Sequence, residues 1–262
     1  QKTAYEILSG LVGSEMCIRD RGRNINNIVL ENLSFGFEPD NPIISNLSFS
    51  FSRNKTISIL GHSGCGKSTL LELISGIREP NSGKIKFKNS HHRLGEIAYM
   101  QQKDLLLPWL NVEENILLPL KIMGKITTES IEDMKNKASI LGIYEYLRYF
   151  PKELSGGLRQ RVSFLRTILQ DSDFILLDEP FASLDSIKRL EIYNWIETHK
   201  DYINKSIILV THDIDEAIFL SDQIIVMDSG VENFKFMIDI NMSHLSLIHI
   251  SEPTRPERIG DC

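Results

Sequence analysis

Apolar residues recur along the chain with two different periods, which predict strands in some segments and helices in others. Alternation of apolar and polar residues over 28–37 and 47–51 predicts two strands, separated by a turn at 39–42 that contains two prolines. The run 56–60 is also strand-like, and 174–177 is continuously apolar, as in a central parallel strand buried on both faces. Further strands are predicted at 84–88, 97–100 and 206–210, and a hairpin at 223–227 and 234–240.

Helical spacing dominates the middle of the chain. Ile131, Met134, Ala138 and Leu141 are separated by three, four and three residues, so they share one face of a helix. This period dominates residues 112–150, and it returns between residues 158 and 169. The pattern predicts a helical lobe, at about residues 104–158, inserted into a domain built on a sheet. The fold class is therefore α/β.

Composition and charge narrow the range of functions. With 262 residues, 42% of them hydrophobic, the chain can bury one large core with a smaller lobe attached. A formal net charge of −6 argues against broad nucleic-acid binding, so no nucleic-acid partner is expected. No apolar run reaches the roughly twenty residues needed to cross a bilayer, and no signal peptide is recognisable, so a cytosolic location is expected.

The two ends of the chain do not resemble natural protein sequence. When residues 245–255 are back-translated with suitable codons, the reverse complement, read one base out of frame, encodes the sequence of residues 11–20. This inverted repeat resembles the end of a transposase-type sequencing adaptor. We hypothesise that residues 1–21 and 245–262 are translated adaptor or chimeric tails that are disordered, and that residues 22–244 form the domain.

A glycine-rich loop follows the strand at 56–60 and precedes a helix predicted at 68–75. It has the pattern of a glycine, four residues and then Gly-Lys-Ser, in which backbone N–H groups at a helix N-terminus surround a polyphosphate. Lys67 would supply a positive charge to the β- and γ-phosphates, and the Ser68 hydroxyl would ligate Mg²⁺. The alternative is an ordinary glycine-rich turn. The candidate nucleotide-binding residues are Gly61, His62, Ser63, Gly64, Cys65, Gly66, Lys67, Ser68 and Thr69.

Polar residues with possible roles in catalysis follow two of the predicted strands. Ligands bind at the carboxyl edge of such sheets, where Asp178 can hold Mg²⁺ through water and Glu179 can orient or deprotonate an attacking water. Alternatively, the two acids cap the next helix. The strand at 206–210 leads to His212, which can sense a γ-phosphate or cap a helix.

Two further features allow both a functional and a structural interpretation. Ser155, Gly156 and Gly157 stand at the start of the helix predicted from residue 158, and such a start binds anions through its free N–H groups or is simply capped by the serine. Phe37 either stacks on an adenine face or belongs to the core.

Together these motifs resemble an ATP-binding cassette (ABC) ATPase over about residues 28–240. The resemblance implies a P-loop NTPase of the ABC type, with a mixed central sheet, an antiparallel β layer and the inserted helical lobe. Phe37 takes the place of a stacking tyrosine. Position by position, the resemblance implies the loop 61–69 as Walker A, Gln102 as the Q-loop glutamine, 154–160 as the signature, 174–178 as Walker B, Glu179 as the catalytic base, Asp185 as part of the D-loop and His212 as the switch histidine.

The resemblance also implies how these residues act. Two copies close head to tail, so that Ser155 and Gly157 of one bind the γ-phosphate of an ATP held by Lys67 of the other. ATP closes this dimer and hydrolysis opens it. The catalytic groups it implies are Glu179, His212, Lys67 and Gln102, and the groups around Mg²⁺ are Ser68, Gln102 and Asp178.

Two stretches, 102–109 and 211–217, resemble importer cassettes of the nitrate, sulfonate and taurine group, which also includes uptake of some thiamine-precursor pyrimidines. This implies an ATPase on the cytoplasmic face of the inner (cell) membrane. Its partners would be a second ABC ATPase subunit and an integral-membrane permease that docks near the Q-loop and the helical lobe. An extracytoplasmic solute-binding protein would take part indirectly. The permease would supply the specificity for the solute and the binding protein would deliver it, so this sequence does not name the solute.

Other interpretations of the same motifs remain open. The apolar cluster at 105–109 is either a buried corner or a surface for another protein. A soluble ABC ATPase acting on ribosomes or DNA is a second functional hypothesis, although the segment between the loop and the signature shows no sustained heptads. A truncated, non-functional cassette is a third.

Overall fold

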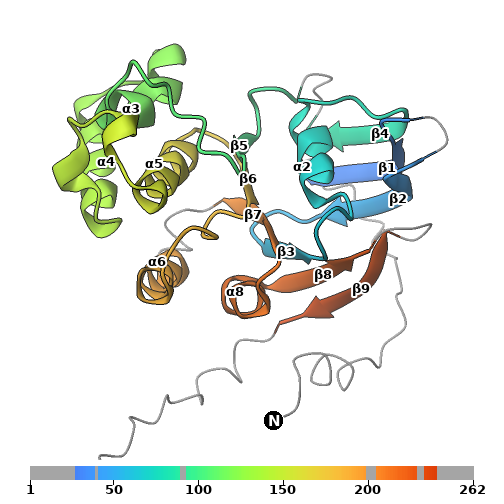
Figure 1. The fold of residues 1–262 in the computed structure, drawn as a ribbon. Helices are drawn as coiled ribbons and strands as arrows, with labels where there is room; N and C mark the ends of the chain where they lie inside the picture. The colour runs from blue at the N-terminus through green and yellow to red at the C-terminus, as the bar shows by residue number, and fades with distance from the viewer. Residues whose placement is uncertain (1–26, 39–40, 89–92, 199–204, 229–232, 241–262) are drawn as a thin grey trace, which may run out of the picture.

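The computed structural model describes residues 27–38, 41–88, 93–198, 205–228 and 233–240. The two tails expected to be foreign, 1–21 and 245–262, lie outside these residues. Figure 1 shows a small sheet, a larger sheet and a group of helices arranged in that order across the molecule. Among the described helices, none has the length and apolar character needed to span a membrane.

The small sheet is antiparallel, as the alternating residues near the start of the chain predicted. Its strands are, in spatial order, β2 (Ile44–Phe51), β1 (Ile28–Phe35) and β4 (Ser82–Phe87). The strand β2 begins at Ile44, three residues before the predicted start. Ile28, Leu30 and Leu33 of β1 are buried, because alternate side chains of a strand point to the same face.

The larger sheet is mixed, which confirms the predicted fold class. In spatial order it contains β5 (Ala98–Met100), β6 (Phe174–Asp178), β7 (Ser206–Thr211), β3 (Thr56–Leu60), β8 (Gln223–Met227) and β9 (Phe234–Asp239). All neighbouring pairs are parallel except β8 and β9, which form the predicted hairpin. The carboxyl ends of the five parallel strands therefore share one edge of the sheet.

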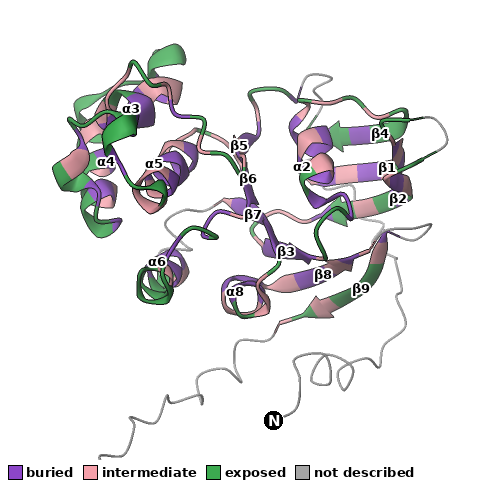
Figure 2. Ribbon diagram, viewed as in Figure 1, coloured by how far each residue is buried: buried purple, intermediate pink, exposed green. Residues whose placement is uncertain are grey.

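The central strands are buried on both faces, which explains their continuous apolar runs. In β6, Ile175 and Leu177 belong to one hydrophobic cluster, and Phe174 and Leu176 belong to another. Figure 2 shows these strands as the most buried part of the molecule. Each face of the sheet must therefore be covered by other elements.

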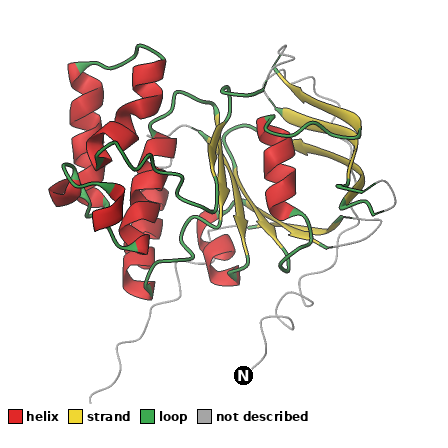
Figure 3. Ribbon diagram, turned by 45° about the horizontal axis from the view of Figure 1, so that its top comes forward, coloured by secondary structure: helices red, strands yellow, loops and turns green. Residues whose placement is uncertain are grey.

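Different elements cover the two faces. On one side lie the antiparallel sheet and helix α2 (Lys67–Ser75), and on the other side lie most of the remaining helices (Figure 3). The segment 104–158 contains α3, α4 and two short 3₁₀ helices, and Met134, Ala138 and Leu141 form the buried face that their spacing predicted. The bounds of the remaining helices are α3 (Val112–Ile122), α4 (Thr128–Ile140), η1 (Tyr144–Tyr146), η2 (Pro151–Glu153), α5 (Gly156–Ile168), α6 (Ser186–Thr198) and α8 (Ile214–Leu220).

Candidate functional site

The glycine-rich loop leads from β3 into α2 and leaves the start of the helix without a side-chain cap. Gly66 adopts a left-handed conformation with φ of 103°, which glycine tolerates because it has no Cβ. Lys67 follows as the first residue of α2 and is only 6% exposed. Its Nζ donates to the carbonyl oxygens of Gly61 (2.8 Å) and His62 (2.9 Å). The lysine thus lies folded over the loop, within reach of any anion that binds there.

The first residue of the loop packs closely against the backbone of β8. A Cβ on Gly61 would lie 2.3 Å from the carbonyl oxygen of Met227, so only glycine fits there. Cys65 is buried and free, and burial raises the pKa of its thiol. His62 lies 3.1 Å from a carboxylate oxygen of Asp228. The exposed residues are His62, Ser63, Gly64 and Ser68, and Thr69 is half-buried.

Asp178, at the end of β6, is only 3% exposed, and its Oδ1 has no hydrogen-bond partner among the described residues. Burial raises the pKa of this carboxyl, and the nearby Glu179 raises it further. Hydrogen bonds from the Ser68 and Tyr99 side chains and the charge of Lys67 act in the opposite direction. An unpartnered buried carboxylate oxygen beside a serine hydroxyl fits a divalent cation.

The described residues contain no cluster of three His, Cys, Asp or Glu side chains that could hold a metal ion. Mg²⁺ does not need such a cluster, because it keeps several waters and is usually bound by one or two protein groups, here Ser68 and Asp178, together with substrate phosphates. The residues present therefore fit Mg²⁺ as part of a metal–nucleotide complex.

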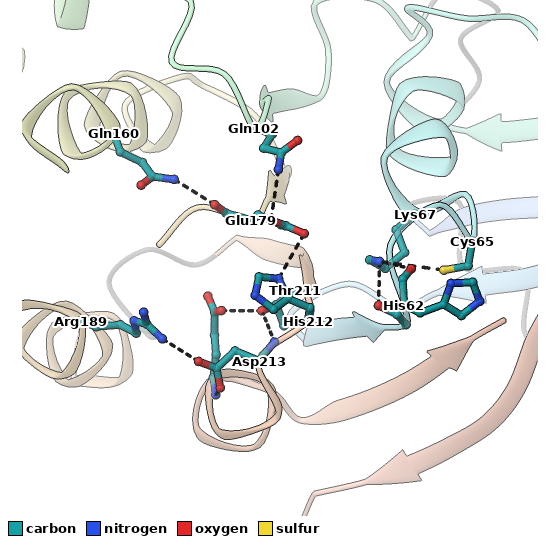
Figure 4. Close-up of polar contacts among 12 residues, drawn as sticks. His62, Cys65, Lys67, Gln102, Gln160, Glu179, Arg189, Thr211, His212 and Asp213 are labelled. Atoms are coloured by element: carbon teal, nitrogen blue, oxygen red, sulfur yellow. Dashed lines mark hydrogen bonds and ion pairs between the residues drawn. The ribbon is translucent and has the colours of Figure 1, made fainter. Parts of the chain in front are cut away.

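Two predicted site residues, Gln102 after β5 and His212 after β7, contact Glu179 (Figure 4). The Nε2 of Gln102 donates to Glu179 Oε2 at 3.2 Å, and the Nδ1 of His212 lies 3.3 Å from Oε1. The backbone N–H of Glu179 donates to Val210 in β7 at 2.9 Å. Its φ is 47°, a left-handed conformation that is rare for a residue with a side chain. Such strain persists where surrounding structure fixes it, often at functional sites.

Other acids cap the neighbouring helices, so two of the alternative interpretations are wrong. Asp213, and not His212, caps α8, because its Oδ1 accepts from the backbone N–H groups of Asp215 and Glu216. Asp185, directly before α6, accepts through its carboxylate from the backbone N–H of Lys188 in the first turn of that helix at 3.0 Å. Neither Asp178 nor Glu179 caps this helix. The His212 side chain is 60% exposed and remains available to a ligand.

The signature segment lies at the exposed start of α5. Ser155 is exposed and caps the helix by accepting from the backbone N–H of Leu158 at 3.3 Å. Gly156 is also exposed, and Gly157 is half-buried. A Cβ on Gly157 would meet Leu184 at 3.3 Å. Figure 1 shows α5, which Ser155 caps, and α2, which the phosphate loop precedes, on opposite sides of β5 and β6.

Phe37 is not part of the core, so that interpretation is corrected. The side chain is 62% exposed and packs edge-on against Phe35, with ring centroids 5.3 Å apart. The guanidinium of Arg78 lies over the Phe37 ring, 5.0 Å from its centroid. Phe37 also lines a hollow of about 330 Å³ together with Pro42 and Asn81. An exposed ring beside a hollow leaves base stacking as its proposed role.

Gln160 is the last residue of the signature segment 154–160 and lies outside the apolar stripe of α5, but its contacts could not be predicted from the sequence. In the structure it is 6% exposed, its Nε2 donates to the backbone oxygen of Glu179 at 2.9 Å, and its Oε1 accepts from the backbone N–H of Ser183 at 3.1 Å. Both partners lie about twenty residues away in sequence, so no local pattern reveals them. Arg189 was missed for the same reason, because it donates to the carboxylate of Asp213, 24 residues away, at 2.6 Å.

Both the sequence and the fold of this chain are similar to those of known proteins. Residues 44–182 match the family model described as "ABC transporter". The chain is 41% identical to the formylaminopyrimidine import ATP-binding protein of Halalkalibacterium halodurans over 76% of this chain and 78% of that protein. It is 34% identical to a taurine import ATP-binding protein of Pseudomonas aeruginosa, over 78% and 80% of the two chains. A solved ATP-binding cassette in a dimeric, post-hydrolysis state bound to ADP and Pi superposes with a TM-score of 0.71, at 25% identity over 82% of this chain and 99% of the other.

Proposed function

The chain belongs to the ABC transporter family of ATP-binding cassettes, and from this premise we propose that it is the ATP-hydrolysing subunit of an importer for a small solute. The observation that carries the catalytic part is the convergence of Gln102 and His212 on Glu179, next to a buried Asp178. These groups lie at the carboxyl edge of the sheet, where the phosphate loop also begins after β3. The arrangement supports attack of water on a γ-phosphate.

In the proposed reaction, Lys67 exchanges the loop carbonyls for the β- and γ-phosphates of ATP, and the uncapped start of α2 directs its N–H groups at them. Ser68 and Asp178 would hold Mg²⁺, which when bound neutralises charge on the phosphate oxygens. Glu179 would orient the attacking water and accept its proton. Gln102 and His212 hold the Glu179 carboxylate in place and would contact the water or the γ-phosphate.

We further propose that the site is completed by a second copy of the chain. Ser155 and Gly157 lie at the exposed start of α5, and this helix is on the other side of β5 and β6 from α2, which follows the chain's own phosphate loop. In a head-to-tail pair this start would bind the γ-phosphate held by Lys67 of the partner. The related cassette bound to ADP and Pi is dimeric. Exposed Asp185 would lie at the same interface.

The remaining partners follow from the importer relatives. The names of the two similar proteins specify import of formylaminopyrimidine and of taurine, and a solute of this size class is proposed here. We propose an integral-membrane permease and, indirectly, an extracytoplasmic solute-binding protein, with this subunit on the cytoplasmic face of the cell membrane. Trp109 is 70% exposed and Leu105 50% exposed, so the apolar segment after Gln102 offers a surface for the permease.

The alternative functions receive less support. The names of these relatives specify import and mention neither ribosomes nor DNA. The chain's net charge of −6 also disfavours binding to nucleic acid. The other alternative, a cassette without activity, is decided by measurement.

The direct test is ATP hydrolysis by the purified chain, followed as phosphate release with and without Mg²⁺. We expect turnover that depends on Mg²⁺ and is lost in excess chelator. Co-purification with a membrane permease, after expression with the neighbouring genes, would test the importer assignment separately. Absence of any Mg²⁺-dependent hydrolysis would contradict the proposed ATPase.

A further inference from the structure

Gln160 joins three parts of the molecule that carry different proposed tasks. It belongs to α5, whose first residues include Ser155 and Gly157. Its amide nitrogen donates to the backbone oxygen of Glu179, and its amide oxygen accepts from the backbone N–H of Ser183, so both ends of one planar group are used. Figure 4 shows the Gln160 side chain reaching from α5 to the backbone of Glu179.

The hydrogen bonds of Gln160 form a link between α5 and Glu179. In the proposed dimer, the two ends of this link contact different nucleotides. The start of α5 would contact the ATP held by the partner, whereas Glu179 would act on the ATP held by its own chain. A displacement of α5 caused by the partner's nucleotide therefore reaches Glu179 through one side chain. We propose that Gln160 is a positioning residue that couples the two ATP sites by fixing the backbone of Glu179 against α5. This inference depends on the proposed dimeric ATPase.

Burial and backbone strain make this link effective. Gln160 is nearly inaccessible to water, and leaving a buried hydrogen-bonding group unsatisfied is unfavourable, so neither contact is readily exchanged for solvent. Glu179 has φ of 47°, a conformation that its own local preferences do not favour. The carbonyl of Glu179 held by Gln160 and the N–H held by Val210 fix this conformation from two sides.

The ends of the link are also tied to the rest of the proposed interface. Ser183 directly precedes Leu184, whose backbone oxygen accepts from Arg189 at 3.1 Å. The same guanidinium donates to Asp213 at 2.6 Å, next to His212. Movement of the 183–185 segment is thereby resisted from both α5 and α6. Gln160 remains the direct connection from α5 to Glu179.

The test uses Gln160→Met, which keeps the length of the side chain but makes neither hydrogen bond, and Gln160→Asn, which keeps the amide but is too short to reach both partners. The control is Thr167→Val. Thr167 is also a buried polar residue of α5, but its hydroxyl bonds only to the helix's own Ser163 carbonyl at 2.9 Å. For each full-length chain, turnover is measured against ATP concentration in Mg²⁺, and nucleotide affinity is measured separately with a fluorescent ATP analogue.

The unaltered chain is expected to show a Hill coefficient above 1. Both Gln160 variants are expected to lower the maximal turnover about tenfold or more, because small displacements of a catalytic group have effects of this size. Their Hill coefficient should fall towards 1, while analogue affinity and the behaviour of Thr167→Val stay within twofold of the unaltered chain. Use of both Gln160 variants keeps the test valid if one of them fails to fold.

Three results would overturn the inference alone: non-cooperative hydrolysis by the unaltered chain, unchanged turnover and cooperativity in a folded Gln160 variant, or an equal loss in Thr167→Val. No hydrolysis by the unaltered chain would instead contradict the proposed function, and the inference with it.

Discussion

Two helices of this molecule begin at glycine-containing segments, yet their starts differ in what surrounds them. The start of α2 has no side-chain cap, and its first residue, Lys67, is buried and bonded to two carbonyl oxygens of the preceding loop. The start of α5 is capped by the hydroxyl of exposed Ser155. We propose that the first is an anion site assembled within one chain. The second lies at an exposed position, and we propose that it binds a phosphate held by another chain.

This difference is the basis of our proposal that the hydrolytic site is shared between two chains. The loop before α2 is fixed by β3 and β8, since Gly61 closely approaches Met227, and the acids at the end of β6 lie beside it. In our proposal these parts bind a nucleotide within one chain. The start of α5 is fixed equally well, through Gln160 and Gly157, but on the far side of β6. The proposal therefore expects hydrolysis to require two chains and nucleotide binding to require one.

The largest effect is expected from Glu179→Gln, which removes the proposed base but keeps the shape of the side chain. Turnover should fall about a hundredfold or more, the scale of a lost general base. ATP affinity should stay close to that of the unaltered chain, because Lys67 and the loop are untouched. Single-turnover hydrolysis and equilibrium binding measure the two quantities. Near-normal hydrolysis would remove Glu179 from its role.

A smaller effect, on binding itself, is expected from Lys67→Ala. A charge-assisted hydrogen bond contributes about 1.5–3 kcal/mol, so affinity for ATP should fall roughly tenfold to a hundredfold. Lys125→Ala serves as a control, because Lys125 pairs with Asp171 on the surface and lies outside the site. Titration with a fluorescent ATP analogue gives both affinities. An unchanged affinity in Lys67→Ala would contradict the phosphate assignment.

The smallest effect is expected on the pH dependence of stability, and it concerns Glu216 in the first turn of α8. Burial raises the pKa of Glu216 to about 7, and its Oε1 has no partner among the described residues, although Thr211 donates to Oε2 at 2.6 Å. Nearby Asp213 raises the pKa further, while Arg189 and His212 lower it. The ionised form is thus disfavoured in the folded chain.

Because the folded-state pKa of Glu216 is the higher one, its contribution to stability is complete below the ordinary carboxyl range and is lost as pH rises to about 7. Glu216→Gln, which stays neutral, should therefore stabilise the fold relative to the unaltered chain at pH 8 by about 1–3 kcal/mol more than at pH 5. Urea unfolding at the two pH values measures this difference. An equal effect at both values would contradict the raised pKa.

The sequence predicted the individual elements better than their arrangement. The apolar runs of β3 and β6 identify buried strands, because a strand covered on both faces has no polar face to reveal. Their order in the sheet could not be predicted. The strand β3 lies between β7 and β8, whose residues follow it by more than a hundred positions, and no local pattern encodes such a pairing.

The candidate site divides in the same way. The loop 61–69 follows a fixed local spacing, so its placement at the start of α2 could be predicted. Glu179 and His212 could be placed at one sheet edge because both follow parallel strands. The role of Gln160 could not, since its partners are backbone groups of other elements. Phe37 remained ambiguous because a lone aromatic residue carries no period, and its exposure decided against the core.

The most direct test of the two-chain site is the oligomeric state of Glu179→Gln, in which bound ATP should persist. Light scattering should give the mass of one chain without nucleotide and of two chains with Mg²⁺ and ATP. Adding Ser155→Arg should keep the protein monomeric at unchanged affinity for the ATP analogue, whereas Ser139→Arg, at an exposed position of α4, should leave the dimer intact. A chain that stays monomeric with ATP, or a dimer that tolerates Ser155→Arg, would contradict the account.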